Sequence, residues 1–200
     1  GPSSDSRQPQ ARASTYPAPS DKSLTRRSRP ARRQVSGRPR HGYFVTVFDL
    51  QTVEDAFCVR EVLDGYAAER AAERIGPEDR ERLRAVLRRC EEMAARDDRS
   101  MGEMIEEMRL GLEIHRIIAE VSGNRLLRDT VCGILDKFQH FVWIELLWLD
   151  EWAVARDEHA AIVEAICAGE GAQAGELARR HVRISKENIL RFLRAKTAFE

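Results

Sequence analysis

Three histidines occupy positions where helical periodicity predicts buried residues. His115, His159 and His181 each fall on a stripe of residues spaced three and four apart, which puts their side chains on one face of a helix. All three imidazoles are therefore expected inside the fold. The other members of the stripes are Met104, Met108, Gly111 and Ile118 for the first histidine, Ala155, Ile162 and Ile166 for the second, and Leu177, Ile184 and Asn188 for the third.

His159 and His181 are also predicted to lie at the same height in a helical hairpin. Gly169 and Gly171 mark the turn, and each histidine is ten residues away from it. At a rise of 1.5 Å per residue, each ring lies roughly 15 Å along its helix. An antiparallel pair then brings the two rings face to face, whereas His115 is too distant in sequence for this estimate.

The chemistry open to these rings is either core packing or metal binding. A single buried histidine is usually satisfied by a carbonyl or a water molecule. Uncompensated polar rings in an apolar core cost about 1 to 3 kcal/mol each, and one shared metal ion would satisfy all three. Imidazole suits zinc, nickel, copper or iron, and the spacing does not choose among them.

Arg60 is the other residue whose type is unexpected on a buried face, since its stripe contains Ala56, Phe57, Leu63 and Ala67. Its guanidinium either pairs with a buried acid, for which Asp64 one turn later is the candidate, or binds an anion. A metal and Arg60 facing one cavity would form a pocket for a carboxylate. His140, in an aromatic segment, is predicted to pack in the core or at an interface, and His41 to be exposed.

The elements that position these residues are predicted to be helices. Beyond residue 50 the apolar pattern is helical, and Gly, Pro and Ser residues fall between the segments. An antiparallel bundle of about six helices is expected, in an all-α fold. The segment 41–50, rich in aromatic and β-branched residues, is a possible short strand. The predicted helices span 52–75, 77–97, 101–122, 124–149, 153–168 and 172–197.

The first 48 residues have a different composition from the remaining 49–200. Within residues 1–40 there are ten basic and two acidic side chains, a balance of +8, whereas the whole chain has 33 of each. Six of the seven prolines also lie there. Such a segment buries too little apolar surface to offset its ordering entropy, so a basic and mostly disordered tail is expected.

Several classes of protein are not supported by the sequence. The four cysteines form no CxxC pair, which argues against a zinc finger and fits buried thiols in a reducing compartment, the cytoplasm. The longest apolar run, 141–149, is too short to span a bilayer and contains Glu145. No nucleotide-binding or hydrolase motif occurs, and we expect no enzyme.

Three segments together resemble a known family. These are "VREVLDGYAAERAAERI" at 59–75, "LEIHRIIAEVSGN" at 112–124 and "DEHAAIVEAICAGEGAQAGELARRHV" at 157–182. They are similar to the FCD domain, the ligand-sensing C-terminal domain of GntR-family transcription regulators, in the metal-binding branch that includes the vanillate-type regulators. The resemblance covers about residues 50–198. "RPRHGYFV" at 38–45 resembles the wing that ends the preceding winged helix-turn-helix.

The resemblance implies a helical bundle around a divalent metal held by three histidines and one Asp or Asn. Small organic acids bind over the metal, often with help from an arginine of the first helix. The histidines correspond to His115, His159 and His181, and the arginine to Arg60. The fourth ligand corresponds to Gly111, which has no side chain to ligate, so the site is expected to be incomplete.

The part of the family that binds DNA is the second departure. A family DNA-binding domain takes roughly seventy residues, whereas about 45 precede the sensor here, and no recognition helix is visible in them. The winged helix is therefore expected to be truncated or degenerate. Its basic residues would bind nucleic acid only through phosphates, or serve as a solvated linker.

The function expected from these features is that of a homodimeric, metabolite-responsive regulator. Its helical domain would bind a small carboxylate at the three-histidine metal site and bias an attached DNA-binding element. The main alternative is a stand-alone sensor or dimerisation module without sequence-specific DNA binding. An enzyme that uses the metal for hydrolysis or lyase chemistry is a third, less favoured reading.

Overall fold

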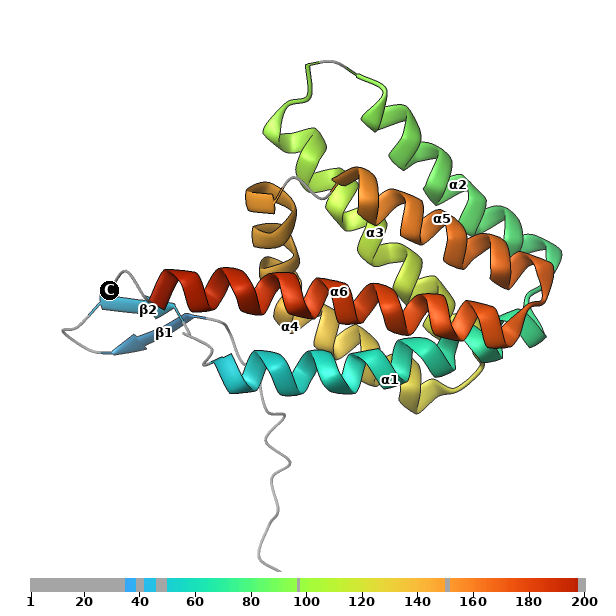
Figure 1. The fold of residues 1–200 in the computed structure, drawn as a ribbon, viewed down its shortest axis with the longest axis horizontal. Helices are drawn as coiled ribbons and strands as arrows, with labels where there is room; N and C mark the ends of the chain where they lie inside the picture. The colour runs from blue at the N-terminus through green and yellow to red at the C-terminus, as the bar shows by residue number, and fades with distance from the viewer. Residues whose placement is uncertain (1–34, 39–41, 46–49, 97, 150–151, 198–200) are drawn as a thin grey trace, which may run out of the picture.

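Six α-helices form the body of the protein in a computed structural model, which describes residues 35–38, 42–45, 50–96, 98–149 and 152–197. The predicted all-α bundle is confirmed, and most helix ends lie within two residues of their predicted positions (Figure 1). The largest difference is in α2, which ends at Ala94 rather than at residue 97. The helices are α1 (Leu50–Arg74), α2 (Pro77–Ala94), α3 (Met101–Val121), α4 (Arg125–Leu149), α5 (Trp152–Ala168) and α6 (Gly171–Thr197).

The helix ends follow from local chemistry that the sequence shows. Ser100 caps α3 in a capping box with Glu103, each accepting a hydrogen bond from the other's backbone N–H. Pro77 stands at the start of α2, where a missing N–H costs nothing. Gly123 and Gly169 follow the ends of α3 and α5 with φ of 74° and 79°, a backbone conformation that favours glycine.

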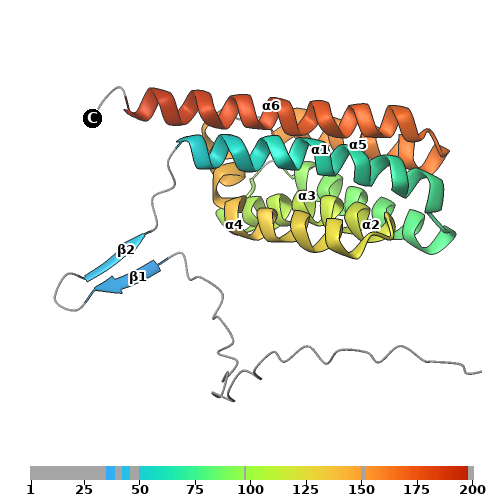
Figure 2. The same ribbon diagram turned by 90° about the horizontal axis from the view of Figure 1, so that it is seen from below.

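The helices pack as antiparallel neighbours. α1 and α6 lie side by side along most of their length, and α5 folds back on α6 as the predicted hairpin (Figures 1 and 2). α3 runs through the middle and contacts α1, α2, α4 and α5. The main apolar core lies between these helices and includes Ala68, Leu83, Ile114, Val131 and Ile166. The buried face of α3 therefore brings His115 to the centre of the domain.

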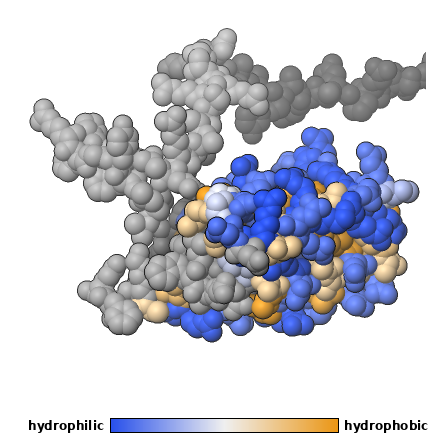
Figure 3. Space-filling model, turned by 90° about the horizontal axis from the view of Figure 1, so that it is seen from above, coloured by the Kyte–Doolittle hydropathy of each residue, from blue (hydrophilic) through white to orange (hydrophobic). Residues whose placement is uncertain are grey.

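A second, smaller apolar cluster holds the start of α1 against α4 and α6, and includes Val53, Phe57, Phe138 and Ile189. The outer surface is mostly hydrophilic on the face shown in Figure 3. Among the described residues, no helix is long and apolar enough to cross a membrane.

Two short strands precede the helices. β1 (Val35–Arg38) pairs antiparallel with β2 (Gly42–Val45), with Val35 opposite Val45. β2 falls within the predicted strand at 41–50. β1 was not predicted within the mostly disordered tail, because its backbone finds its hydrogen-bond partners in β2 and such a pairing cannot be read from composition. His41, residues 1–34 and the predicted boundary at 48/49 lie outside the described residues.

Candidate metal centre and effector cavity

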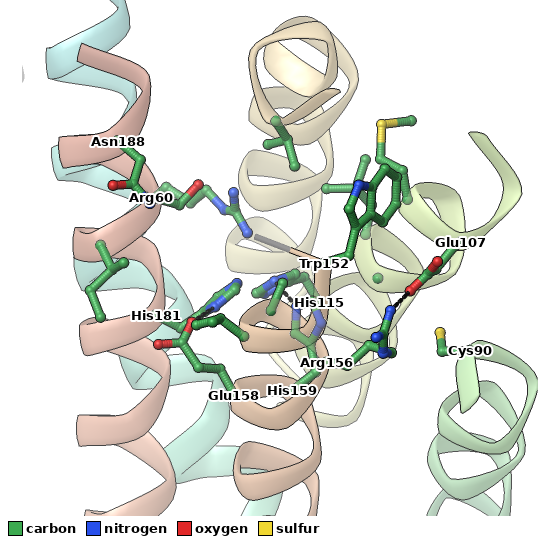
Figure 4. Close-up of a pocket in the computed structure, with 18 residues that line it drawn as sticks. Arg60, Cys90, Glu107, His115, Trp152, Arg156, Glu158, His159, His181 and Asn188 are labelled. Carbon is green, nitrogen blue, oxygen red and sulfur yellow. Dashed lines mark hydrogen bonds and ion pairs between the residues drawn. The ribbon is translucent and has the colours of Figure 1, made fainter. Parts of the chain in front are cut away.

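The three predicted histidines meet in the core. His115 comes from α3, His159 from α5 and His181 from α6, and all three are buried. The ring centroids lie 5.1 Å (His115 to His159), 5.2 Å (His115 to His181) and 4.5 Å (His159 to His181) apart. One ring nitrogen of each lies within 4.8 Å of the others, and no other such group is found in the described part of the chain (Figure 4). The height argument for His159 and His181 is thus confirmed.

Two of the rings are oriented by carboxylates on their outer nitrogens. Nδ1 of His115 lies 3.2 Å from a carboxylate oxygen of Asp64, and Nδ1 of His181 lies 2.7 Å from one of Glu158. An ionised carboxylate only accepts, so each Nδ1 carries the proton and each Nε2 presents its lone pair. Carboxylates in this position typically orient histidine ligands of metal ions and increase their basicity.

Sequence reasoning missed Glu158. Glu158 directly precedes His159 on α5. The turn geometry that predicts His159 at the height of His181 therefore also brings Glu158 to nearly that height. Asp64 was predicted only as the partner of Arg60, because nothing in the sequence places α1 against α3.

The buried rings of His115 and His159 are neutral. Burial, together with the positive charge of Arg60, lowers the pKa of His115 to about 4, although Asp64 opposes the shift. Burial and the two neighbouring histidines hold the pKa of His159 well below its ordinary value. A metal ion binds the unprotonated imidazole. These two neutral rings can therefore act as ligands without first releasing a proton.

The contact between His115 and His159 is close enough for a hydrogen bond. Their Nε2 atoms are 3.1 Å apart. Since the proton of His115 is on Nδ1, the Nε2–H of His159 donates here. Two nitrogens converging on one point, with a third nearby, also fit a tetrahedral N-donor metal such as Zn²⁺.

Arg60 forms the predicted pair with Asp64, and its binding of an anion stays a prediction. It is buried, its Nε donates to Asp64 at 2.9 Å, and it also lines the cavity beside the histidines. Burial raises the pKa of Asp64, but the charge of Arg60 and the hydrogen bond from His115 outweigh it and hold that pKa below its ordinary value. Asp64 therefore links the guanidinium to the histidine cluster.

The cavity in front of the rings has a volume of about 60 Å³. A single water needs roughly 10 to 15 Å³ by this kind of measure, so only a small ligand fits without movement of the walls. The walls combine the histidines and Arg60 with apolar side chains such as Leu112, Trp152 and Ile184.

The far wall of the cavity contains a second ionic group that sequence reasoning missed. The buried carboxylate of Glu107, on α3, accepts hydrogen bonds from both Arg99 and Arg156. The guanidinium of Arg99 also lies 5.5 Å from the ring centroid of Trp152, within cation–π range. Glu107 lies one turn before Gly111 on the buried side of α3, whereas its neighbour Glu106 is partly exposed and pairs with Arg89.

Comparison with known proteins identifies the domain, since the FCD domain family matches residues 55–184. The chain belongs to the FCD domain family. The predicted resemblance is confirmed, although the metal-binding branch stays a prediction. FCD regulators are not enzymes, and the chain is thus a metabolite-sensing regulator rather than a catalyst.

Solved structures share the fold of this FCD protein. Streptococcus agalactiae GntR is 17% identical, with a TM-score of 0.57 over 77% of this chain and 74% of its own. E. coli McbR/YncC is 16% identical, with a TM-score of 0.60 over 79% of this chain and 77% of its own. Among curated proteins, none matches the sequence significantly.

Gly111 lies where the resemblance places a fourth ligand of the FCD site. It lines the cavity one turn before His115. A Cβ built there would lie 3.2 Å from Cε1 of His159, a tight contact that requires the ring to move by a few tenths of an ångström. The position therefore faces the histidine cluster, but it contributes no ligand atom of its own.

The remaining histidine of the described part is not in this group. His140 is half-buried on α4, and its ring centroid lies 4.0 Å from that of Phe141. Burial lowers its pKa. It takes part in aromatic packing, as predicted.

The expectation of buried thiols holds for Cys90 and Cys167 but is wrong for Cys58, which is exposed on α1.

Proposed function

We propose that this protein is a transcription regulator whose FCD domain binds a divalent metal ion through His115, His159 and His181 and a small carboxylate effector beside it. The observation that supports this most is the pair of carboxylates on the outer nitrogens of His115 and His181. These carboxylates take the Nδ1–H of His115 and of His181, so each Nε2 faces the cluster as an acceptor, where the Nε2 atoms of His115 and His159 lie 3.1 Å apart. The metal, when bound, supplies a Lewis-acidic centre for the effector's oxygens.

The effector is a small organic acid. Arg60 provides a positive charge at the cavity, and its guanidinium can form paired hydrogen bonds with a carboxylate. The cavity of about 60 Å³ favours short acids over long-chain ones. Because only three protein ligands are present, an acid that chelates the metal completes its coordination and binds cooperatively with it.

Calorimetry with zinc-loaded protein tests this proposal. Short hydroxy and keto acids should bind, and binding should weaken at least about tenfold in Arg60→Gln, equivalent to 1.4 kcal/mol. Arg82→Gln, which removes an exposed arginine from the α2–α3 contact, is the control. If neither zinc nor any short acid binds the wild-type protein, the proposal fails.

The DNA half of the function concerns the N-terminal segment. The β1–β2 hairpin agrees with the wing-like resemblance of residues 38–45, and residues 1–40 carry a net charge of +8. We propose that residues 1–48 act with a second copy of the chain in binding DNA in the cytoplasm. Gel-shift assays against random and enriched sequences should then show a sequence preference.

A stand-alone sensor is the second candidate, and one observation favours it. The segment 15–37 has no apolar period that would predict a recognition helix. Such a tail gives only phosphate binding, whose affinity falls steeply with salt. Affinity that is equal for all sequences and disappears on adding salt would favour this candidate over the regulator that reads DNA.

A further inference from the structure

Asp64 contacts both a candidate metal ligand and the candidate effector arginine. One oxygen of its carboxylate, Oδ2, accepts a hydrogen bond from Nε of Arg60 at 2.9 Å and lies 3.2 Å from Nδ1 of His115. Arg60, Asp64 and His115 are 2%, 4% and 5% exposed. A single buried anion therefore lies between a permanent positive charge and a neutral ring.

The geometry of Arg60 leaves part of its guanidinium available to a ligand. In the described part of the chain, Arg60 forms its hydrogen bond through Nε, and its guanidinium carbon lies 5.7 Å from the centroid of the Phe57 ring, within cation–π range. Figure 4 shows Arg60 pointing into the cavity, toward the histidine rings. The terminal amino groups are therefore the part that can bind a carboxylate.

Glu158 provides a comparison within the same site. Its carboxylate lies 2.7 Å from Nδ1 of His181, in the same position that Asp64 occupies beside His115. In the described part of the chain, Arg60 forms its ion pair with Asp64 and not with Glu158. Both carboxylates can orient a histidine, but Asp64 also contacts the arginine.

We infer that Asp64 is a positioning residue that couples effector binding at Arg60 to metal binding at His115. A carboxylate on Arg60 compensates the charge of the guanidinium, so the charge of Asp64 acts more strongly on His115. A stronger hydrogen bond from Nδ1–H makes Nε2 a better ligand for a metal ion. Burial increases the effect, because charges interact more strongly in a medium of low dielectric constant.

This inference rests on the proposed function and adds how the two ligands of that site influence each other. Coupling between binding sites is reciprocal, so the metal raises the affinity for the acid by the same factor as the acid raises that for the metal. An acid that chelates the metal contributes coupling of its own. Carboxylate variants separate the two contributions, because direct chelation is present in all of them.

Zinc titrations of the full chain with and without glycolate, a short hydroxy acid, test the inference. Glycolate should raise the zinc affinity of the wild type, and Asp64→Asn should reduce this enhancement at least about fivefold. Asparagine keeps the shape of the side chain but not its charge. Glu158→Gln is the matched control, since it should lower zinc affinity by about 10- to 100-fold and keep the enhancement.

A double-mutant cycle tests the route through Arg60. Arg60→Gln should reduce the enhancement, and adding Asp64→Asn should reduce it no further. Additive effects would overturn the inference, and so would an enhancement that is as high in Asp64→Asn as in Glu158→Gln. Both results leave the metal site in place, whereas a wild type that binds no zinc contradicts the proposed function itself.

A measurement on zinc-free wild-type protein does not require an Asp64 variant to fold. Saturating glycolate should shift the nitrogen NMR signal of His115 Nδ1, because the hydrogen bond to Asp64 becomes stronger. Arg60→Gln should abolish the shift. A His115 signal that does not move, or that moves equally in Arg60→Gln, would overturn the inference.

Discussion

Gly111 has the greatest expected influence on the strength of the proposed metal site. It faces the histidine cluster from α3, one turn before His115, yet it offers no ligand. A three-histidine site leaves open positions on the metal, which an effector can occupy. The absence of a side chain thus favours exchange of ligands over tight retention of the ion.

Substitution of Gly111 tests this reading. Gly111→Asp should increase affinity for zinc by about tenfold or more, because a fourth ligand joins the three imidazoles. Gly111→Ala is the steric control, since its Cβ makes the same close approach to His159 without a ligand atom. Competition titrations with a fluorescent chelator measure both. Equal affinities in the two variants would show that position 111 does not face the metal.

Residue by residue, the site was predictable to the extent that helix geometry fixed it. The fixed rise of a helix placed His159 opposite His181, and the spacing of apolar residues turned all three rings inward. The pairing of Glu107 with Arg156 was not predictable, because it depends on α5 meeting α3, a contact between segments far apart in sequence. Asp64 was predicted as an ion-pair partner only.

At the scale of elements, Glu107 ties three parts of the chain together. Its carboxylate joins α3 to Arg156 on α5 and to Arg99 in the α2–α3 connection. Breaking a buried charged group away from its partners costs more than losing a surface pair. Cys90, which lines the same cavity, reports on this wall, because burial raises the pKa of its thiol to about 11 and keeps it unreactive.

Glu107→Gln should therefore loosen the wall. We expect a loss of about 1.5 to 3 kcal/mol in the free energy of unfolding and faster labelling of Cys90 by a thiol reagent, measured in a Cys58→Ser background. Glu106→Gln, which removes an exposed carboxylate from the same helix, should change neither quantity. Cys90 labelling that is equally slow in both variants would mean that the wall does not depend on Glu107.

The elements themselves were largely predictable, for local reasons. Capping residues, glycines and Pro77 are read directly from the sequence, and five helices end at or within two residues of the predicted positions. β1 was not predictable in this way. A strand without a strong alternation of apolar residues is defined by the strand it pairs with, and that pairing is not a local property.

At the scale of the whole molecule, burying neutral histidines makes stability depend on pH. The unfolded chain protonates histidine near pH 6.5, whereas folded His115 does so only near 4 and His159 well below 6.5. Between these values the unfolded state binds more protons, so stability falls as the pH falls. The contribution of His115 is complete above about pH 6.5 and is lost as the pH falls through about 4, and that of His159 is lost over the same direction of pH change.

Denaturation of metal-free protein measures this dependence. The free energy of unfolding should decrease by up to about 1.4 kcal/mol per pH unit for each of the two rings as the pH falls from 6.5 toward 4. His115→Gln with His159→Gln should have a flatter profile, while His140→Gln should keep most of the slope. A wild-type profile that is flat over this range would contradict neutral burial of the two rings.

Metal content tests the central claim most directly. The purified chain is dialysed against zinc, and the bound metal is measured by inductively coupled plasma mass spectrometry. About one zinc per chain should remain in the wild type and in the His140→Ala control, and none should remain in His159→Ala or His181→Ala, with folding verified by circular dichroism. A wild type that retains no zinc, or histidine variants that retain as much as the wild type, would show that the three rings are packing residues only.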